Sequence, residues 1–333
     1  PLKHHAGNTF ISNFEIKEQE YLMDSREHHK KELHLGEGGT GKTTKNVKDK
    51  GFIKKCFFAP SWKLARNKEQ ELGVRCNVWY NLLCNDPEVF GRIQRSSNVL
   101  IIDEVSMLDD KEKEKIFNRF SDCKIIMCGD VGFQLDGFAV DEKRYHPFTL
   151  SGFDNIVSHN TNYRVKCPIL AKHLKEIRQL MTNGMHQLVR KYVLDNFKVI
   201  DKIENYKVED MILARTHNLK NGYTEQFRHL PKYYVIKTDR KHCKGEIVVG
   251  EQPENSVLQH AFTIHSIQGE TAEENLYIEM DRMFDAKAIY TAISRARNKD
   301  YNVLGCFCYS LYASEWLYAQ RYQTGKFFGN SWF

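Results

Sequence analysis

The stretch that decides the fold is Gly36-Glu37-Gly38-Gly39-Thr40-Gly41-Lys42-Thr43, which follows the strand-like segment 32–35. It matches the pattern G-x-x-x-x-G-K-[ST] and lies between a predicted strand and a predicted helix, the context that this pattern requires. Glycines let backbone N–H groups converge on phosphate oxygens, and the helix N-terminus adds a favourable dipole. The pattern therefore predicts a phosphate-binding loop, and a chance glycine-rich turn is the alternative.

The residue types in this loop predict how it would hold a nucleoside triphosphate. Lys42 would neutralise the β- and γ-phosphate oxygens, and the hydroxyl of Thr43 would bind Mg²⁺. The expected nucleotide-binding residues in and beside the loop are Gly36, Gly38, Gly39, Thr40, Gly41, Lys42, Thr43 and Thr44.

Two acidic residues, Asp103 and Glu104, follow the apolar run 98–102. Both carboxylates would lie at the carboxyl end of a buried strand, where parallel sheets bind ligands. Asp103 would hold Mg²⁺ together with Thr43, and Glu104 would orient and deprotonate the attacking water. An isolated Asp-Glu pair would favour a solvated acidic loop, but the upstream phosphate loop favours the catalytic interpretation.

Another polar residue, Gln134, comes shortly after the predicted strand 124–128. Its amide could contact the γ-phosphate and transmit its presence to a second domain. The alternative is that Gln134 is a polar residue in a turn. Gln134 joins Lys42, Asp103 and Glu104 among the candidate catalytic residues.

Length and composition indicate a two-domain protein. The chain has 333 residues, of which 41% are hydrophobic and 28% charged, enough for two cores of ordinary size. The formal net charge of +6 and the pI near 8.7 permit a phosphate-bearing partner without requiring one.

Cysteine spacing and hydropathy limit the setting in which the chain works. The nine cysteines show no C-x-x-C pair that would build a zinc site, which indicates a reduced, intracellular chain. No stretch approaches the roughly 18 apolar residues that span a bilayer, and the start lacks the apolar region of a signal peptide. Since Pro1 stands where an initiator Met would be, we expect a fragment excised from a larger protein.

Short apolar runs alternate with charged helical stretches, a pattern typical of parallel α/β sheets. The predicted buried strands are 33–35, 55–59, 99–102, 124–128, 211–214, 276–278 and 302–306, and the clearest predicted helices are 110–120 and 168–181. A glycine-containing polar stretch at 147–154 indicates a domain boundary. We therefore expect an extension at 1–32, a first domain at 33–150 and a second at 151–333.

The order of motifs resembles that of superfamily 1 helicases, most closely the branch of Pif1, RecD and Dda. The resemblance covers most of the chain. The segments that match motifs I, Ia, II, III, IV, V and VI of that family are, in order, 36–43, 57–66, 101–107, 128–135, 161–165, 261–271 and 290–298.

The resemblance implies two RecA-like domains with ATP in the cleft between them and with only minimal accessory insertions. Arg164 and Arg295 would be arginine fingers that stabilise charge on the transferring phosphoryl group, and for each the alternative is a surface ion pair. Gln268 and Gly269 would approach the γ-phosphate. Gln19, upstream of the phosphate loop, would read the adenine, unless it is simply polar helix surface.

The resemblance also implies a track for single-stranded nucleic acid. The candidate contact residues are Pro60, Ser61, Trp62, Tyr80, Thr216, His265 and Ser266. Aromatic side chains such as Trp62 stack on bases, although Trp62 could instead be core and His265 a buried, satisfied histidine. Tyr80 stands where relatives often carry a histidine, a departure that puts its strand contact in doubt. The segment 239–255 could form a hairpin and little more.

The expected function is therefore an ATP-dependent helicase or translocase, moving 5′ to 3′ on single-stranded DNA in replication or repair. One alternative is the RNA helicase of a positive-strand RNA virus, and another is an idle nucleic-acid-binding scaffold. We also expect a viral or mobile-element origin, further domains of a larger replication protein, and an intracellular location in the cytoplasm or nucleus, including that of an infected host cell.

Overall fold

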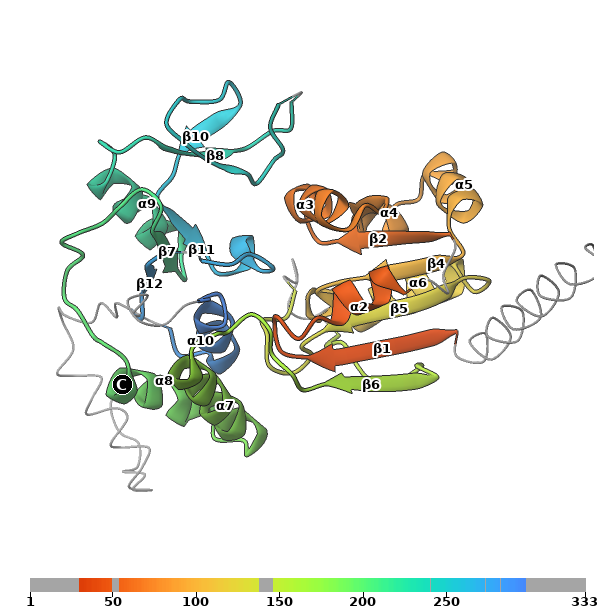
Figure 1. The fold of residues 1–333 in the computed structure, drawn as a ribbon, viewed down its shortest axis with the longest axis horizontal. Coiled ribbons are helices and arrows are strands. Elements are labelled where there is room, and N and C mark those ends of the chain that lie inside the picture. Colours follow the sequence, from red (N-terminus) through yellow and green to blue (C-terminus); the bar gives the residue numbers. More distant parts are fainter. Residues whose placement is uncertain are drawn as a thin grey trace, which may run out of the picture.

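The phosphate loop connects strand β1 (Lys31–Gly36) to helix α2 (Lys42–Lys48) in the computed structural model. The structure describes residues 30–49, 54–137, 146–239, 241–272, 274–281 and 283–297. These residues form two α/β halves, drawn on the right and on the left in Figure 1. Gln19, most of the expected extension 1–32 and the predicted strand 302–306 lie outside the described residues.

The first half is built on a six-stranded parallel sheet. Its strands, in spatial order, are β3 (Cys76–Val78), β2 (Lys55–Ala59), β4 (Val99–Ile102), β5 (Lys124–Gly129), β1 and β6 (Asn155–His159). Every neighbouring pair is parallel. Successive side chains of a strand point to opposite faces, and both faces of the central strands are buried, which explains their continuous apolar sequence.

Helices cover both faces of this sheet. They are α2, α3 (Trp62–Leu72), α4 (Tyr80–Leu83), α5 (Pro87–Ser96) and α6 (Asp110–Arg119), with a short 3-10 turn η1 (Val105–Met107) after β4. On one face Val47 of α2 and Leu64 of α3 pack in a cluster with Phe57 and Ile101. On the other face residues of α4, α5 and α6 pack with the alternate strand positions, such as Phe58.

The second half has its own parallel sheet, with the strand order β11 (Ala261–Thr263), β7 (Met211–Ala214), β12 (Leu276–Ile278). Its helices are α7 (Pro168–Thr182), α8 (His186–Asn196), α9 (His217–Gln226) and α10 (Ala286–Ile293). The helices α7, α8 and α10 form one large core with this sheet, and Leu135 from the first half is part of it. The two halves therefore share apolar contact.

Beside it lies a three-stranded antiparallel sheet with the order β10 (Ser256–Leu258), β8 (Lys232–Val235), β9 (Ile247–Val249). The hairpin expected within 239–255 is thus wrong in its extent, because β8 pairs on one side with β9 and on the other with β10. Short strands with polar neighbours give only a weak alternation signal, and β8 and β10 were missed for that reason.

The predicted strands 33–35, 55–59, 99–102, 124–128, 211–214 and 276–278 are confirmed, and so are both predicted helices. The boundary expected at 150/151 is too early, because β6 adds to the edge of the first sheet by pairing with β1 from Glu32–Asn155 to Gly36–His159. An edge strand is only half-buried, so the sequence of β6 lacks the apolar run that identifies the central strands.

Two further expectations concern the environment. The seven cysteines among the described residues are all free thiols. In the same part of the chain, no helix combines the length and apolarity needed to cross a membrane.

Candidate functional site

The phosphate loop follows the end of β1 and wraps around the side chain of Lys42. Gly41, which precedes α2, has a left-handed backbone (φ 74°) that favours glycine. Lys42 is 7% exposed, and its Nζ donates to the carbonyl oxygens of Gly36 (2.7 Å) and Glu37 (2.8 Å). The hydroxyl of Thr40 also donates to the Glu37 carbonyl, at 2.9 Å. The loop thus holds a buried ammonium group among backbone oxygens, next to the start of a helix.

Thr43 and Asp103, the two residues expected to bind Mg²⁺, touch each other. The hydroxyl of Thr43 donates to Oδ2 of Asp103 at 2.7 Å, and Oδ1 of Asp103 accepts from the backbone N–H of Glu104 at 3.0 Å. A hydroxyl and a carboxylate are hard oxygen ligands of the kind that Mg²⁺ prefers. The donor set therefore fits this metal.

Glu104 has an unusual backbone for its residue type. Its φ of 54° makes it the one residue other than glycine with a positive φ among the described residues. Such strain is found mostly at functional sites, where neighbouring structure enforces it. Burial raises the pKa of Glu104, the charge of Asp103 raises it further, and Arg295, Lys42 and Arg164 oppose the rise. A raised pKa makes the carboxylate a stronger base.

Gln134 links the two halves of the site. It is 1% exposed. With its amide oriented to satisfy both neighbours, Nε2 donates to Oε2 of Glu104 at 2.7 Å and Oε1 accepts from Nη2 of Arg295 at 3.2 Å. The amide thus joins the carboxylate that follows β4 to a guanidinium just after α10.

Arg295 comes from the second half and is fully buried. Its guanidinium donates to the carbonyl oxygens of Thr291 (3.1 Å) and Glu270 (3.3 Å) and to the hydroxyl of Ser294 (2.9 Å). Burial lowers the pKa of Arg295 to about 10, and the charge of Arg164 lowers it too, although Glu104 opposes this. The group stays charged at neutral pH. Because the side chain is fully buried, the alternative of a surface ion pair is wrong.

Arg164 lies directly on the phosphate loop. A Cβ atom added at Gly39 would come within 2.2 Å of the Arg164 Cβ, and one at Gly38 within 2.8 Å of its Nη1. A side chain is therefore excluded at Gly39, whereas one at Gly38 would displace the end of the Arg164 side chain. Among the described residues, Nη1 of Arg164 is a buried donor with no hydrogen-bond partner. A guanidinium with a buried, unpaired Nη1 beside a phosphate loop fits an anionic ligand.

Part of the predicted site lines a cavity of about 590 Å³ between the two halves. Its lining includes the expected site residues Gly38, Gly39, Gly41, Lys42, Thr43, Thr44, Asp103, Glu104, Arg164 and Gly269. It also includes residues that the sequence did not single out, namely Leu64, Asn67, Lys68, Glu71, Tyr163, Glu270, Thr271 and Arg297. The volume is of the size that binds small molecules and cofactors.

Gln268 and Gly269 lie at the interface between the halves. Nε2 of Gln268 donates to the Ser106 hydroxyl at 3.2 Å and to the Leu135 carbonyl at 3.4 Å. Gly269 has φ 89°, and a Cβ atom there would come within 2.9 Å of Leu64 and 3.7 Å of Glu104 Oε1. Gly269 therefore approaches the acidic pair, whereas the side chain of Gln268 faces Ser106 and Leu135 of the first half.

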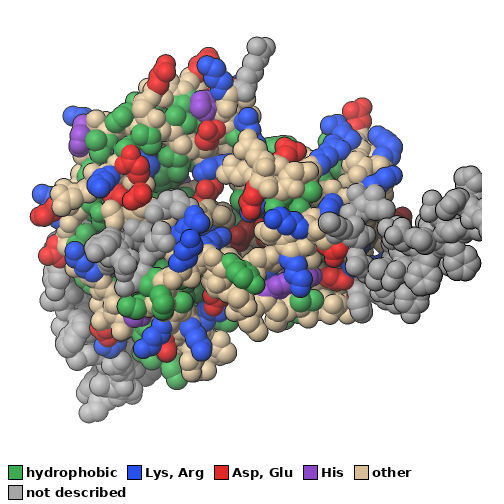
Figure 2. Space-filling model, in the orientation of Figure 1, with side chains coloured by type: hydrophobic (Ala, Val, Ile, Leu, Met, Phe, Trp, Pro, Cys, Tyr) green, Lys and Arg blue, Asp and Glu red, His purple; other side chains and the backbone are tan. Residues whose placement is uncertain are grey.

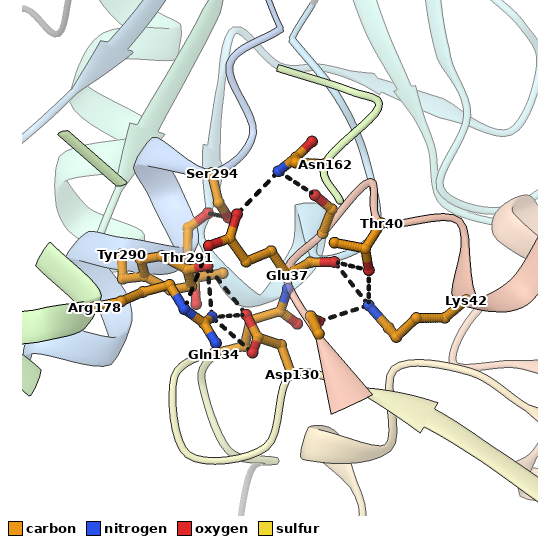
Figure 3. Close-up of polar contacts among 12 residues, drawn as sticks. Glu37, Thr40, Lys42, Asp130, Gln134, Asn162, Arg178, Tyr290, Thr291 and Ser294 are labelled. Atoms are coloured by element: carbon orange, nitrogen blue, oxygen red, sulfur yellow. Dashed lines mark hydrogen bonds and ion pairs between the residues drawn. The ribbon is translucent and has the colours of Figure 1, made fainter. Parts of the chain in front are cut away.

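A polar network that the sequence did not predict joins the same elements. Nη1 of Arg178, on α7, donates to both carboxylate oxygens of Asp130 (2.8 and 2.7 Å) and to the Tyr290 hydroxyl (2.9 Å). Arg178 also lies over the ring of Phe133, 3.6 Å from its centre, and its Nε is 3.4 Å from Glu37 Oε1. Figure 3 shows Asp130, Tyr290 and Glu37 around the guanidinium of Arg178. Glu37, Asp130, Phe133 and Tyr290 lie inside motif matches, whereas Arg178, which joins them, lies in none.

The expected nucleic-acid contacts follow the carboxyl ends of parallel strands in both halves. Trp62 and Tyr80 are 48% and 68% exposed, so the alternative that Trp62 is core is wrong. The hydroxyls of Ser61 and Thr216 accept from backbone N–H groups as caps of α3 and α9. Ser266 is exposed in the turn η3 (His265–Ile267), while burial lowers the pKa of the half-buried His265.

The surface around the interface is rich in basic groups. Figure 2 shows Lys and Arg side chains on both sides of the hollow between the two halves, with acidic side chains deeper inside. Basic rims with polar floors attract phosphate groups.

Comparison with known proteins supports the same assignment of fold. A family model described as an AAA domain matches residues 17–140. No curated protein matches the chain. Among solved structures, a Pif1 helicase studied for DNA unwinding at forked double-stranded DNA has a TM-score of 0.62 at 15% identity, covering 92% of this chain and 96% of its own.

Two further structures agree. The Pif1 helicase from Candida albicans has a TM-score of 0.61 at 15% identity, over 92% of this chain and 98% of that one. The Pif1 helicase from Bacteroides, in complex with ADP-AlF3 and single-stranded DNA, has a TM-score of 0.60 at 15% identity, over 92% and 97%. The chain therefore has the fold of the Pif1 helicases, with two RecA-like α/β halves and the candidate nucleotide site between them.

Proposed function

We propose that this chain is an ATP-hydrolysing helicase or translocase that acts on single-stranded DNA. The observation that carries the proposal is the chain of contacts from Thr43 through Asp103, Glu104 and Gln134 to Arg295. It connects the phosphate loop and the acidic pair, which line the cavity, to a buried guanidinium from the opposite half, which lies behind the cavity wall. A site divided between two halves can convert nucleotide turnover into relative movement of those halves.

The chemistry assigned to each residue follows from its contacts. Lys42 exchanges the backbone carbonyls that it now contacts for phosphate oxygens. Glu104, whose pKa is raised by burial, accepts a proton from the attacking water. Arg164 and Arg295 stabilise the negative charge that develops on the transferring phosphoryl group. Mg²⁺, held by Thr43 and Asp103, supplies further charge neutralisation at the phosphates when it is bound.

The choice of DNA rests on the fold. The Bacteroides Pif1 structure of similar fold is a complex with single-stranded DNA, and another Pif1 structure concerns DNA unwinding. We extend this to movement from 5′ to 3′ and to a role in replication or repair, by analogy of fold alone. Exposed Trp62 and Tyr80 would stack on bases, and Ser61, Thr216 and Ser266 would contact the sugar-phosphate backbone.

The test is steady-state ATP hydrolysis without nucleic acid and with matched single-stranded DNA or RNA. We expect strong stimulation by DNA in the wild-type protein, and turnover close to zero for Glu104→Gln and Lys42→Ala, whose strand binding should persist. Greater stimulation by RNA than by DNA would identify RNA as the nucleic acid along which the protein moves. No ATP turnover under any condition would favour the idle scaffold.

Binding to the strand has its own test. If basic groups neutralise backbone phosphates, the affinity for single-stranded DNA should fall steeply as the salt concentration is raised. Binding releases counterions condensed on the DNA, and the free energy gained by that release becomes smaller at higher salt. A fluorescence-anisotropy titration with labelled oligothymidylate at several salt concentrations measures this slope. Affinity independent of salt would contradict a track that follows the backbone.

A further inference from the structure

The phosphate loop contains an acidic residue, Glu37, at its second position. A loop that binds phosphate attracts anions through its backbone N–H groups and helix dipole, so a carboxylate within it opposes that attraction. Nothing in the chemistry of ATP hydrolysis assigned above uses this side chain. The contacts of the Glu37 carboxylate therefore indicate its role.

The carboxylate of Glu37 is held by the second half of the molecule. Nδ2 of Asn162 donates to Oε2 of Glu37 at 3.0 Å, and Nε of Arg178 lies 3.4 Å from Oε1. Figure 3 shows the side chain extending away from Lys42 toward these two partners. Glu37 belongs to the first half, whereas Asn162 lies between β6 and α7, and Arg178 lies on α7 of the second half.

The orientation of the Asn162 amide is fixed by its own neighbours. Its Oδ1 accepts from the backbone N–H groups of Arg164 (2.9 Å) and Val165 (3.1 Å), which leaves only the Nδ2 donor for Glu37. The same Nδ2 donates to the Gly38 carbonyl at 3.2 Å, and the N–H of Tyr163 donates to the Gly39 carbonyl at 2.9 Å. The segment that carries the candidate finger Arg164 is thereby fastened to the loop.

Arg178 is fixed as well, by its paired bonds to Asp130 and by the ring of Phe133. The guanidinium edge that reaches Glu37 is thus positioned before any ligand arrives. Asp130 and Phe133 follow β5 of the first half, so separation of the halves would break these contacts of Arg178 together with the contacts of Glu37 to Arg178 and Asn162. The negative charge of Glu37 would then act on the loop with less compensation.

We propose that Glu37 makes the phosphate affinity of the loop depend on domain closure: the closed arrangement neutralises its carboxylate through Asn162 and Arg178, and opening releases a negative charge that expels the nucleotide. This inference rests on the proposed function as an ATPase. It assigns the side chain of Glu37 a role in product release and identifies Asn162 and Arg178 as positioning residues.

The test measures release of mant-ADP, a fluorescent ADP, by stopped-flow chase with unlabelled ADP. Glu37→Gln, which keeps the shape and removes the charge, should slow release by about threefold to tenfold, as expected for removing one charge near the phosphates at intermediate dielectric. Glu225→Gln, at an exposed carboxylate of α9, is the matched control and should leave the rate unchanged.

The coupling is tested by a second pair of variants. Arg178→Gln should speed release in the wild-type background and have no effect in the Glu37→Gln background, with exposed Lys175→Gln on α7 as its control. Because loss of Arg178 leaves buried Asp130 unpaired and could prevent folding, Asn162→Asp gives an independent test. It keeps the acceptor for Arg164 and Val165 but adds charge next to Glu37, so it should also speed release.

Three results would overturn the proposal: an unchanged release rate in Glu37→Gln, an equal effect of Arg178→Gln in both backgrounds, or unaltered release in Asn162→Asp. Failure of the proposed function is recognised separately, since a wild-type protein that binds no mant-ADP at any concentration would refute the ATPase itself.

Discussion

At the scale of single residues, the site depends on close approach between the halves. Glycine is required at position 39 because the Cβ atom of Arg164 occupies the space that a side chain would need. Glu104 accepts an unfavourable backbone conformation at the end of β4, and Gln134 then ties its carboxylate to Arg295. The side chains expected to carry the reaction are therefore positioned by contacts across the interface, not by the phosphate loop alone.

Gly39→Ala should reduce ATP turnover far more than it reduces stability. The new methyl group would displace Arg164 and Asn162, and displacement of a catalytic group by about 1 Å can cost about a hundredfold in rate. Gly73→Ala is the control, since Gly73 also has a positive φ (64°) but no described atom within 4 Å of its Cβ position. Both variants should lose about 1 kcal/mol of stability from backbone strain. Equal turnover in the two would contradict the contact with Arg164.

Gln134→Leu should lower kcat for ATP hydrolysis by about tenfold to a hundredfold, because it removes the only described link between Glu104 and Arg295. The affinity for ADP should change little, since Gln134 does not line the cavity. Steady-state kinetics and an ADP titration separate these effects. A loss confined to ADP affinity would assign Gln134 to nucleotide binding instead.

At the scale of elements, the segment that leads into the edge strand β6 is bound to α6 by a buried cation, Lys113. Lys113 is fully buried, and its Nζ donates to Thr149 Oγ1 at 2.9 Å, to the carbonyl oxygens of Thr149 and Ser151, and pairs with Asp110 at 2.6 Å. This places the start of β6 beside β1. The end of β6 in turn packs against the phosphate loop, since a Cβ atom at Gly36 would come within 2.5 Å of the His159 carbonyl.

Lys113→Met should destabilise the protein by about 2 to 4 kcal/mol, because an apolar side chain of similar length leaves several oxygens without their donor. Urea denaturation followed by circular dichroism measures the change. Lys111→Met, at an exposed position of the same helix, should stay within about 0.5 kcal/mol of the wild type. A loss below 1 kcal/mol for Lys113→Met would mean that the connection is held by its other contacts.

At the scale of the whole molecule, histidines of lowered pKa make stability depend on pH. His260 is fully buried between the Tyr206 hydroxyl and the Leu230 carbonyl, and burial, aided by the charge of Lys232, lowers its pKa to about 4. Burial also lowers the pKa of His159, His173 and His265. Between the ordinary pKa and the lowered one the unfolded chain binds more protons, so each histidine makes the fold less stable as the pH falls through that window.

His260→Gln isolates one of these contributions from the buried carboxyl groups whose raised pKa acts in the opposite direction. The wild-type protein should have the higher free energy of unfolding at pH 7.5. Its advantage over the variant should shrink by about 1 to 2 kcal/mol at pH 5, because there the wild type must release the proton of this histidine on folding and the variant has no such proton to release. Urea denaturation at the two pH values measures the gap. A constant gap would mean that His260 keeps its ordinary pKa in the fold.

The sequence by itself determined those parts whose signals are local. The phosphate loop, the strand that ends in Asp103-Glu104 and the central strands of both parallel sheets were all predicted, because glycine requirements and continuous apolar runs depend on neighbours in the chain. Motif order, through the resemblance that it carries, also placed Arg164 and Arg295 among the site residues; in the structure Arg164 lines the cavity, and Arg295 reaches Glu104 through Gln134.

Only the tertiary structure decided what depends on distant partners. The half-buried β6 joins the first sheet beyond the expected boundary, because its pairing with β1 requires no apolar run. The antiparallel sheet arises from three short strands, each too short to show a period. Arg178 gains its importance from Asp130, Tyr290 and Glu37, which lie 48, 112 and 141 positions away along the chain. A guanidinium on a helix has the same local sequence signal whether it faces solvent or a buried carboxylate, and only packing distinguishes the two.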